Sequence, residues 1–177
     1  MEWTLPGTVL QVSEQDVSQI PALFSSMFLS GGMVLSQVCS ITGLECYTVQ
    51  NWVKREFLSP PDNKRYSMVQ LCRIIELNML KSVLPMEQIC GFVAYINAQM
   101  PTQTLDDADL YFLFVRLVAF YRQNKDLQQR RTYMQKLLTE CPQETAHRVK
   151  KVLSIMVTAH MASQLRQEAE EMVRQLN

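Results

Sequence analysis

The chain has 177 residues, of which 47% are hydrophobic, which is enough for one domain or two small ones around a buried core. Seventeen basic residues balance seventeen acidic ones, so net charge does not indicate a nucleic-acid binder, and such a function would depend on local clusters. Five cysteines without a C-x-x-C pair indicate reduced thiols. Neither a signal peptide nor an apolar stretch of membrane-spanning length is present, so we expect a cytoplasmic protein without membrane contact.

Apolar residues recur at helical spacing along most of the chain, and alternating strand patterns are almost absent. This periodicity predicts an all-α protein. Residues 1–15 look irregular, whereas residues 17–28 carry apolar side chains at helical spacing and are followed by Gly31 and Gly32, which favour a helix end. We therefore expect an N-terminal arm and a short packing helix within residues 1–30.

The central block, residues 31–98, begins with an expected helix over residues 35–42 that ends at Gly43. A second helix is expected over residues 46–57. A helix of roughly a dozen residues follows Ser67, which can form a capping box with Gln70. A shorter helix should follow Pro85, a residue suited to a first helical turn. A helix, a glycine turn and a polar-faced helix predict a helix-turn-helix domain.

The remaining residues, 99–177, are predicted to form a C-terminal helical bundle after a linker at residues 98–104. Helices are expected over residues 107–124 and 126–140, followed by a long last helix that begins near residue 143. Apolar residues of that helix repeat at intervals of four, three and four, which suits packing on the domain or on a second chain. This C-terminal region is thus a candidate for dimerisation or sensing. The repeat consists of Leu165, Ala169, Met172 and Leu176.

The helix expected over residues 46–57 has two different faces. With about 100° of rotation per residue, Val49, Trp52 and Val53 share one side, which can dock on the preceding helix. The outward side carries amide, hydroxyl and basic groups, which suit base edges and phosphates in the major groove. The candidate DNA-binding residues of this helix are Tyr47, Thr48, Gln50, Asn51, Lys54 and Arg55.

The next segment, S-P-P-D-N-K-R-Y-S at residues 59–67, breaks the helix at two prolines. Turn chemistry then predicts a short basic wing over residues 62–66. Lys64 and Arg65 would contact DNA there, and Tyr66 offers an apolar body for packing and a hydroxyl for a phosphate. Two basic surfaces at this spacing predict a transcriptional regulator that binds double-stranded DNA, and two-fold operators favour a homodimer.

An alternative function fits the same pattern. Any surface helix carries polar residues on its outer face, and the chain as a whole has no net charge. A non-catalytic protein-interaction module that retains the winged-helix fold would look similar. Such a module should expose an apolar patch of a few hundred Å² or more, which a DNA-binding surface does not need.

The stretch from Leu35 to Ser67 resembles the MerR-type winged helix. Thr42-Gly43 matches the turn of that family, and Arg65-Tyr66 resembles its wing, whereas Glu56 stands where the family usually has a glycine. More closely, the segments N-W-V-K, P-P and K-R-Y-S are similar to an uncharacterised bacterial domain-of-unknown-function family. The resemblance covers roughly residues 20–120. It implies a winged helix-turn-helix fold and, for MerR relatives, DNA binding, but no measured function.

Catalytic, metal and cofactor sites are not expected, because no nucleophile–base constellation, nucleotide-binding glycine motif or four-ligand metal spacing appears. We therefore expect that the protein is not an enzyme. His147 and His160 are thirteen residues apart, a poor spacing for a shared ligand face. We expect the aromatic residues of the C-terminal helices to form core. The alternative is that they line a sensor pocket for an unknown small-molecule effector. They are Tyr111, Phe112, Phe114, Phe120, Tyr121 and Tyr133.

Overall fold

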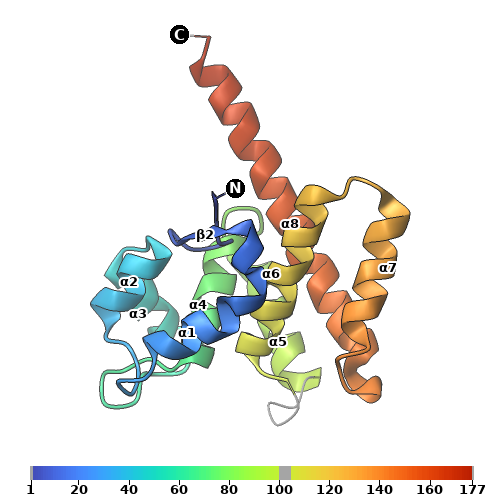
Figure 1. Cartoon of the computed structure of the whole chain (residues 1–177). Coiled ribbons are helices and arrows are strands. Elements are labelled where there is room, and N and C mark those ends of the chain that lie inside the picture. The colour runs from blue at the N-terminus through green and yellow to red at the C-terminus, as the bar shows by residue number, and fades with distance from the viewer. Residues whose placement is uncertain (1, 100–104, 177) are drawn as a thin grey trace.

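The computed structural model describes residues 2–99 and 105–176 and is mainly helical, as predicted. Its helices pack side by side, and a small two-stranded hairpin lies at the N-terminus (Figure 1). Strand β1 (Glu2–Thr4) pairs antiparallel with β2 (Gln11–Ser13), so the expectation of an irregular start was wrong. Each strand has only three residues and Trp3 alone among them is buried, so no alternating pattern marks them in the sequence.

A 3₁₀ helix (Glu14–Gln19) and helix α1 (Ile20–Met27) follow the hairpin and form the short packing helix expected from the sequence. The proline of α1 occupies the first turn, where its missing N–H costs no hydrogen bond. Ile20 and Phe24 bury one side of α1 against the core. Gly31 and Gly32 then take left-handed backbone angles, which glycine adopts easily.

Helices α2 (Leu35–Thr42) and α3 (Cys46–Lys54) are joined by a turn at Gly43, whose φ of 67° lies in the left-handed region. The range of α2 matches the prediction, but α3 ends at Lys54 and not at residue 57. The N–H of Phe57 donates to the carbonyl oxygen of Trp52 (2.9 Å) and that of Glu56 to Val53 (3.1 Å). This pair of bonds is a Schellman motif, which closes a helix early through a left-handed residue.

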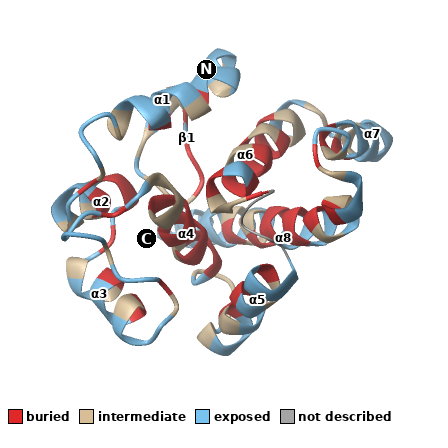
Figure 2. Ribbon diagram, turned by 90° about the horizontal axis from the view of Figure 1, so that it is seen from below, coloured by how far each residue is buried: buried red, intermediate tan, exposed pale blue. Residues whose placement is uncertain are grey.

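Helix α4 (Met68–Leu80) is the central helix and buries nearly all of its residues (Figure 2). It packs against α2, α6 and α8. The predicted capping box is confirmed, because Ser67 and Gln70 exchange both hydrogen bonds (3.2 and 2.8 Å). Helix α5 (Met86–Gln99) has 14 residues and α4 has 13, so the expectation of a shorter helix was wrong. Residues 100–104 of the expected linker lie outside the described residues.

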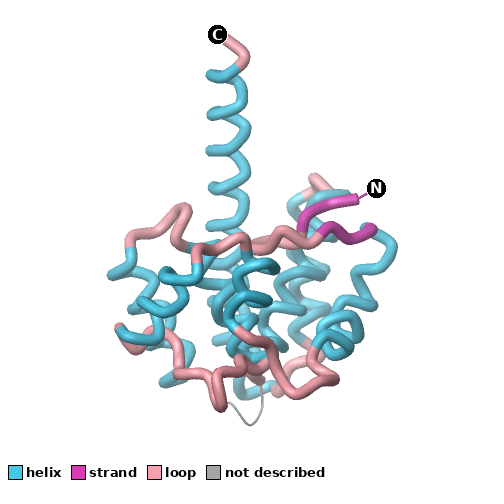
Figure 3. Tube along the Cα trace, turned by 90° about the vertical axis from the view of Figure 1, so that its left-hand side faces the viewer, coloured by secondary structure: helices cyan, strands magenta, loops and turns pink. Residues whose placement is uncertain are grey.

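Helices α6 (Asp107–Gln123), α7 (Leu127–Leu138) and α8 (Gln143–Arg174) form the C-terminal region. The first part of α8 packs on α4, α6 and α7, whereas its last turns project beyond the other helices (Figures 1 and 3). From Leu165 onward every described residue of α8 is exposed. Among residues 2–99 and 105–176, no helix combines the length and apolar character that crossing a membrane requires.

One connected hydrophobic core joins residues from the N-terminal hairpin to α8. Its largest fully buried side chains include Phe24, Tyr111 and Phe114, and the Tyr111 hydroxyl donates to the carbonyl oxygen of Pro6 (3.0 Å). The aromatic rings of α6 therefore fix α1 and the N-terminal segment to the bundle. Tyr111 and Phe114 are packing residues, in agreement with the core interpretation of these aromatics.

Candidate nucleic-acid interface

The α2–α3 pair presents one face of α3 to solvent. Val49 and Trp52 of α3 are buried, at 0% and 5% exposed, and Val38 and Ile41 of α2 are buried as well. The sequence alternates these apolar residues with polar ones at helical spacing, so docking α3 on its apolar side turns the polar side outward. The exposed residues on α3 and at its C-terminus are Tyr47, Gln50, Asn51, Lys54 and Arg55, with Thr48 half-buried.

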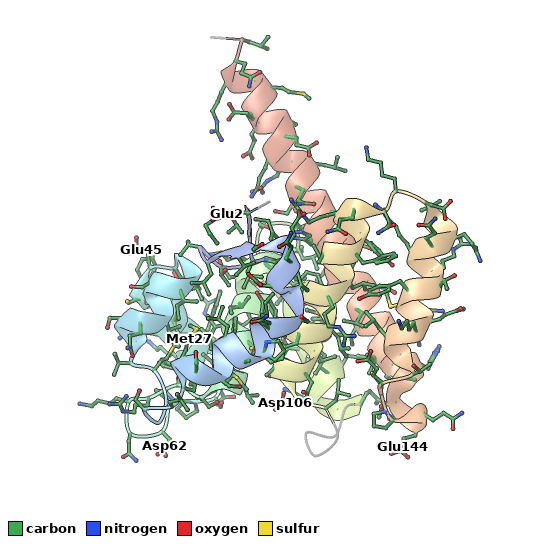
Figure 4. The ribbon with its side chains drawn as sticks, viewed as in Figure 1. Glu2, Met27, Glu45, Asp62, Asp106 and Glu144 are labelled. Atoms are coloured by element: carbon green, nitrogen blue, oxygen red, sulfur yellow. The ribbon has the colours of Figure 1, made fainter. Side chains whose placement is uncertain are left out.

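The loop of residues 59–67 (the 59–67 loop) forms a tight hairpin at its tip. The N–H of Arg65 donates to the carbonyl oxygen of Asp62 (2.8 Å), and between them Asn63 and Lys64 both have positive φ, 46° and 63°. Two consecutive left-handed residues define a type I′ turn, whose twist matches that of a β-hairpin. Figure 4 shows Asp62 on this loop, projecting from the body, well away from Glu45 at the start of α3.

The base of the 59–67 loop is fastened to the segment before α2. Met33 and Tyr66 exchange two backbone hydrogen bonds (3.0 and 2.7 Å), and the guanidinium of Arg65 donates to the carbonyl oxygen of Gly32 (2.9 Å). On the other side, the amide of Gln70 donates to the carbonyl oxygens of Ser59 and Pro60 (3.1 and 3.0 Å). The base of the loop is therefore tied to the segment before α2 and to the start of α4.

Tyr66 differs from the other predicted contact residues. Only 3% of its surface is exposed, and burial raises the pKa of its hydroxyl above the ordinary value. Its ring packs on the core between the loop and α2, which agrees with the packing part of its expected role. Lys64 and Arg65 remain exposed, so they are the basic residues that the loop offers to a partner.

A groove of about 700 Å³ lies between α3, the start of α2 and the 59–67 loop. Gln50, Lys54, Lys64 and Tyr66 border it, so four of the nine predicted residues surround one hollow. Tyr47, Thr48, Asn51, Arg55 and Arg65 lie outside its lining. The floor is largely apolar, which the sequence interpretation missed, because these residues come from three separate segments. The apolar lining consists of Val34, Leu35, Val53 and Pro61.

The local charge is more positive than the neutral total suggests. Between residues 46 and 66 four basic residues, Lys54, Arg55, Lys64 and Arg65, stand against two acidic ones, Glu56 and Asp62, and all six are exposed. The net excess in this segment is only two positive charges, but every charged residue that contributes to it is exposed to solvent. It therefore acts on any ligand that approaches α3 and the loop.

A second group of polar side chains joins α4 to the neighbouring helices α5 and α6. The guanidinium of Arg73 donates two hydrogen bonds to Asp107 (2.8 and 2.7 Å) and one to Asn97 (3.0 Å). Burial raises the pKa of Asp107 and, with the charge of Asp107, raises that of the fully buried Glu76 well above its usual range. Residues 34 positions apart in sequence form this pair, so sequence spacing gave no sign of it. Asp107, in the first turn of α6, ties this helix to α4.

In the part of the chain that the structure describes, the remaining titratable groups do not meet the requirements of a metal site. No cluster of three or more histidine, cysteine, aspartate or glutamate side chains suits a metal ion within residues 2–99 and 105–176. His160 lies against Phe114 in an edge-to-face arrangement, and burial lowers its pKa to about 4. Burial and a hydrogen bond with Cys46 raise the pKa of Cys39 to about 12, so the Cys39 thiol stays protonated.

The fold and this surface define a mainly helical protein that presents one exposed polar helix face beside a basic hairpin loop. Comparison with known protein families matches residues 17–114 to the family described as domain of unknown function (DUF1836). The match covers more than half of the chain, which therefore belongs to this family and confirms the predicted membership of a domain-of-unknown-function family. Neither the curated proteins nor the solved structures gave a match.

Proposed function

We propose that the protein is a DNA-binding transcriptional regulator with a MerR-like winged helix-turn-helix. Helix α3 would enter the major groove, and the 59–67 loop would act as the wing. The observation that carries this proposal is the exposure of Lys54 and Arg55 at the end of α3 and of Lys64 and Arg65 on the 59–67 loop, with Lys54 and Lys64 bordering the same groove. Two neighbouring basic surfaces suit the sugar-phosphate backbone on one side of a groove.

Base reading would come from the amides of α3. Gln50 and Asn51 are both exposed on the outward face, and such amides can pair with two atoms of an adenine edge. Their positions before Lys54 leave the lysine free to reach a phosphate or a guanine. The modest excess of positive charge fits a protein whose affinity depends on a few phosphate contacts and on dimerisation.

Dimerisation would use the projecting end of α8. Leu165, Met172 and Leu176 are 64%, 67% and 83% exposed, although they repeat at the spacing of a coiled-coil seam. A second copy would cover this stripe, and two reading heads would then address a two-fold operator. Replacing Leu165 and Met172 with glutamate should yield monomers in sedimentation velocity and weaken operator binding.

The test is fluorescence anisotropy with duplexes from the upstream region of the protein's own gene, measured at several salt concentrations. We expect binding to one sequence that weakens linearly with the logarithm of salt concentration. The double variant K54A/K64A should weaken binding about tenfold or more and flatten the salt slope by up to about two. The control K150A/K151A removes the same charge from an exposed part of α8 and should bind as the wild type does.

The groove supports a second candidate function, a protein-interaction module. Its apolar floor between Val34, Val53 and Pro61 can accept an apolar side chain of a peptide. Two results together would favour this module over the regulator. The protein would not bind DNA even at low salt, and it would capture a partner protein that V53E no longer captures but K150A/K151A still does. Undiminished DNA binding by K54A/K64A would reject the proposed contacts.

A further inference from the structure

A second hollow lies at the C-terminal end of α4, whereas the 59–67 loop is attached to the N-terminal end of the same helix. It has a volume of about 580 Å³ and is bounded by the hairpin segment 3–8, the C-terminal end of α4, the end of α6 and the middle of α8. Figures 1 and 3 show the N-terminus at the end of the body from which α8 projects. Such a size suits a small organic molecule.

The wall of this hollow (the hairpin cavity) contains polar groups that no described residue satisfies. The indole Nε1 of Trp3 and the imidazole Nε2 of His160 are both buried and lack a hydrogen-bond partner in the described part of the chain. Trp3 is 95% buried, being 5% exposed. Unpaired buried donors and acceptors cost free energy. Both residues line the cavity, but the two atoms themselves are covered, so a ligand would reach them only if the rings moved slightly.

The charged groups around the hairpin cavity select the class of ligand. Lys81 and Arg122 are the cations among the described lining residues, which include no aspartate or glutamate. Arg122 stacks over the Trp3 ring at 5.3 Å and donates long hydrogen bonds of 3.3 and 3.4 Å to Glu14, outside the lining. Bonds of this length are weak, so a carboxylate can compete for the guanidinium.

The remaining lining residues add uncharged donors and an apolar surface. Gln164 and Gln167 offer hydrogen bonds, whereas the amide N–H groups of Asn78 already donate within the protein. The hydroxyls of Ser82 and Ser163 contact each other at 3.1 Å. The lowered pKa leaves His160 neutral at pH 7. It can therefore act as a hydrogen-bond partner, but it adds no positive charge to the cavity. Leu5, Pro6 and Met79 complete the wall with apolar atoms.

We propose that the hairpin cavity binds a small organic acid, with a carboxylate held by Arg122 and the rest of the molecule against Trp3 and His160. Lys81, whose ammonium group lies 5.9 Å from the centroid of the Trp52 ring, adds positive charge at the edge of the cavity. The binding itself does not depend on DNA binding. A regulatory consequence, which rests on the proposed function, follows from Asn78. Its amide donates to the carbonyl oxygens of Gly7 (2.9 Å) and Thr42 (2.8 Å), and so joins the cavity wall to the end of α2.

Isothermal titration calorimetry with the full chain tests the site, with acetate, succinate, citrate and inorganic phosphate as probes. We expect saturable binding of succinate or citrate with a Kd below about 1 mM, and weaker binding of acetate and phosphate. R122M should weaken binding at least about tenfold, because a charge-assisted hydrogen bond is lost. R131M removes an exposed guanidinium from α7 and serves as the control.

Circular dichroism must show that R122M remains folded, and K81M supplies a second variant at the same site. Failure of all four probes to bind, or equal binding by wild type, R122M and K81M, would overturn the proposal. Repeating the DNA titration in the presence of citrate distinguishes the proposed anion site from the proposed DNA-binding function. Anion binding without DNA binding keeps the hairpin cavity and rejects the regulator, whereas DNA binding without anion binding does the reverse.

Discussion

Glu56 is an unusual residue for its place in the structure, and its replacement by glycine is the sharpest test of the local architecture. It occupies the left-handed position that closes α3, with φ of 63°. Glycine is the residue most often found at this position, because it has no Cβ to clash with the carbonyl oxygen. The side chain is exposed, so E56G removes no buried contact.

The expected size follows from two opposing terms. A left-handed backbone costs an L-residue roughly 1–2 kcal/mol, which E56G recovers. Glycine also makes the unfolded chain more flexible, which costs about 0.5–1 kcal/mol. The net stabilisation should be about 0.5–1 kcal/mol, equivalent to a rise in Tm of roughly 1–4 °C for a chain of this size.

Urea unfolding and thermal unfolding of E56G, E56A and the wild type provide the assay. E56A removes the same charge but keeps a Cβ at the strained position, so its stability should stay near that of the wild type. Both variants should bind DNA slightly more tightly if Lys54 and Arg55 contact phosphates, because a neighbouring negative charge is lost. Equal stabilisation by E56A and E56G would refute the backbone explanation and assign the effect to charge.

Three further predictions concern stability. Burial holds the pKa of His160 at about 4, below the ordinary value of 6.5. The native state therefore takes up this proton less readily than the unfolded chain, and up to about 3 kcal/mol of stability is lost as pH falls from 6.5 to 4. H160Q should flatten this loss in urea unfolding at several pH values, whereas H147Q, at an exposed site, should not. R73L should cost about 3–5 kcal/mol, because Asp107 is left buried and unpaired, and R73L/D107L should recover part of that loss. G7A should destabilise by more than about 1 kcal/mol, because its φ is positive and its Cβ would lie 2.5 Å from the carbonyl oxygen of Ile75; G91A, with open space around it, is the matched control.

The sequence predicted those features that depend on a few neighbouring residues. The range of α2, its glycine stop at Gly43 and the capping box of Ser67 and Gln70 all follow from local rules of helix starts and ends. The end of α3 was placed three residues too late, because Glu56 gives no stop signal. The left-handed angle of Glu56 lets the N–H groups of Phe57 and Leu58 both donate to the carbonyl oxygen of Trp52 (2.9 and 3.4 Å) and places Leu58 in the core.

Features that depend on distant segments could not be predicted in this way. The Arg73–Asp107 pair, the groove floor and the hairpin cavity each combine residues from elements that meet only in the folded chain. Trp3 is an example, because its isolated position in an irregular segment gave no periodicity to interpret. Its ring is buried, and the guanidinium that lies over it belongs to Arg122 of α6, more than one hundred residues later in the chain.

Helix α4 relates the two candidate sites to each other. At its N-terminal end Gln70 fastens the 59–67 loop through hydrogen bonds to Ser59 and Pro60, and at its C-terminal end Asn78 holds Gly7 and the last carbonyl of α2. The helix is buried along nearly its whole length and packed interiors resist deformation, so a displacement at one end must be shared by the other. An anion that binds Arg122 in the hairpin cavity would therefore act on the hairpin and, through Asn78, on α4 and α2. The separation between α3 and its loop is the quantity that such a shift would change.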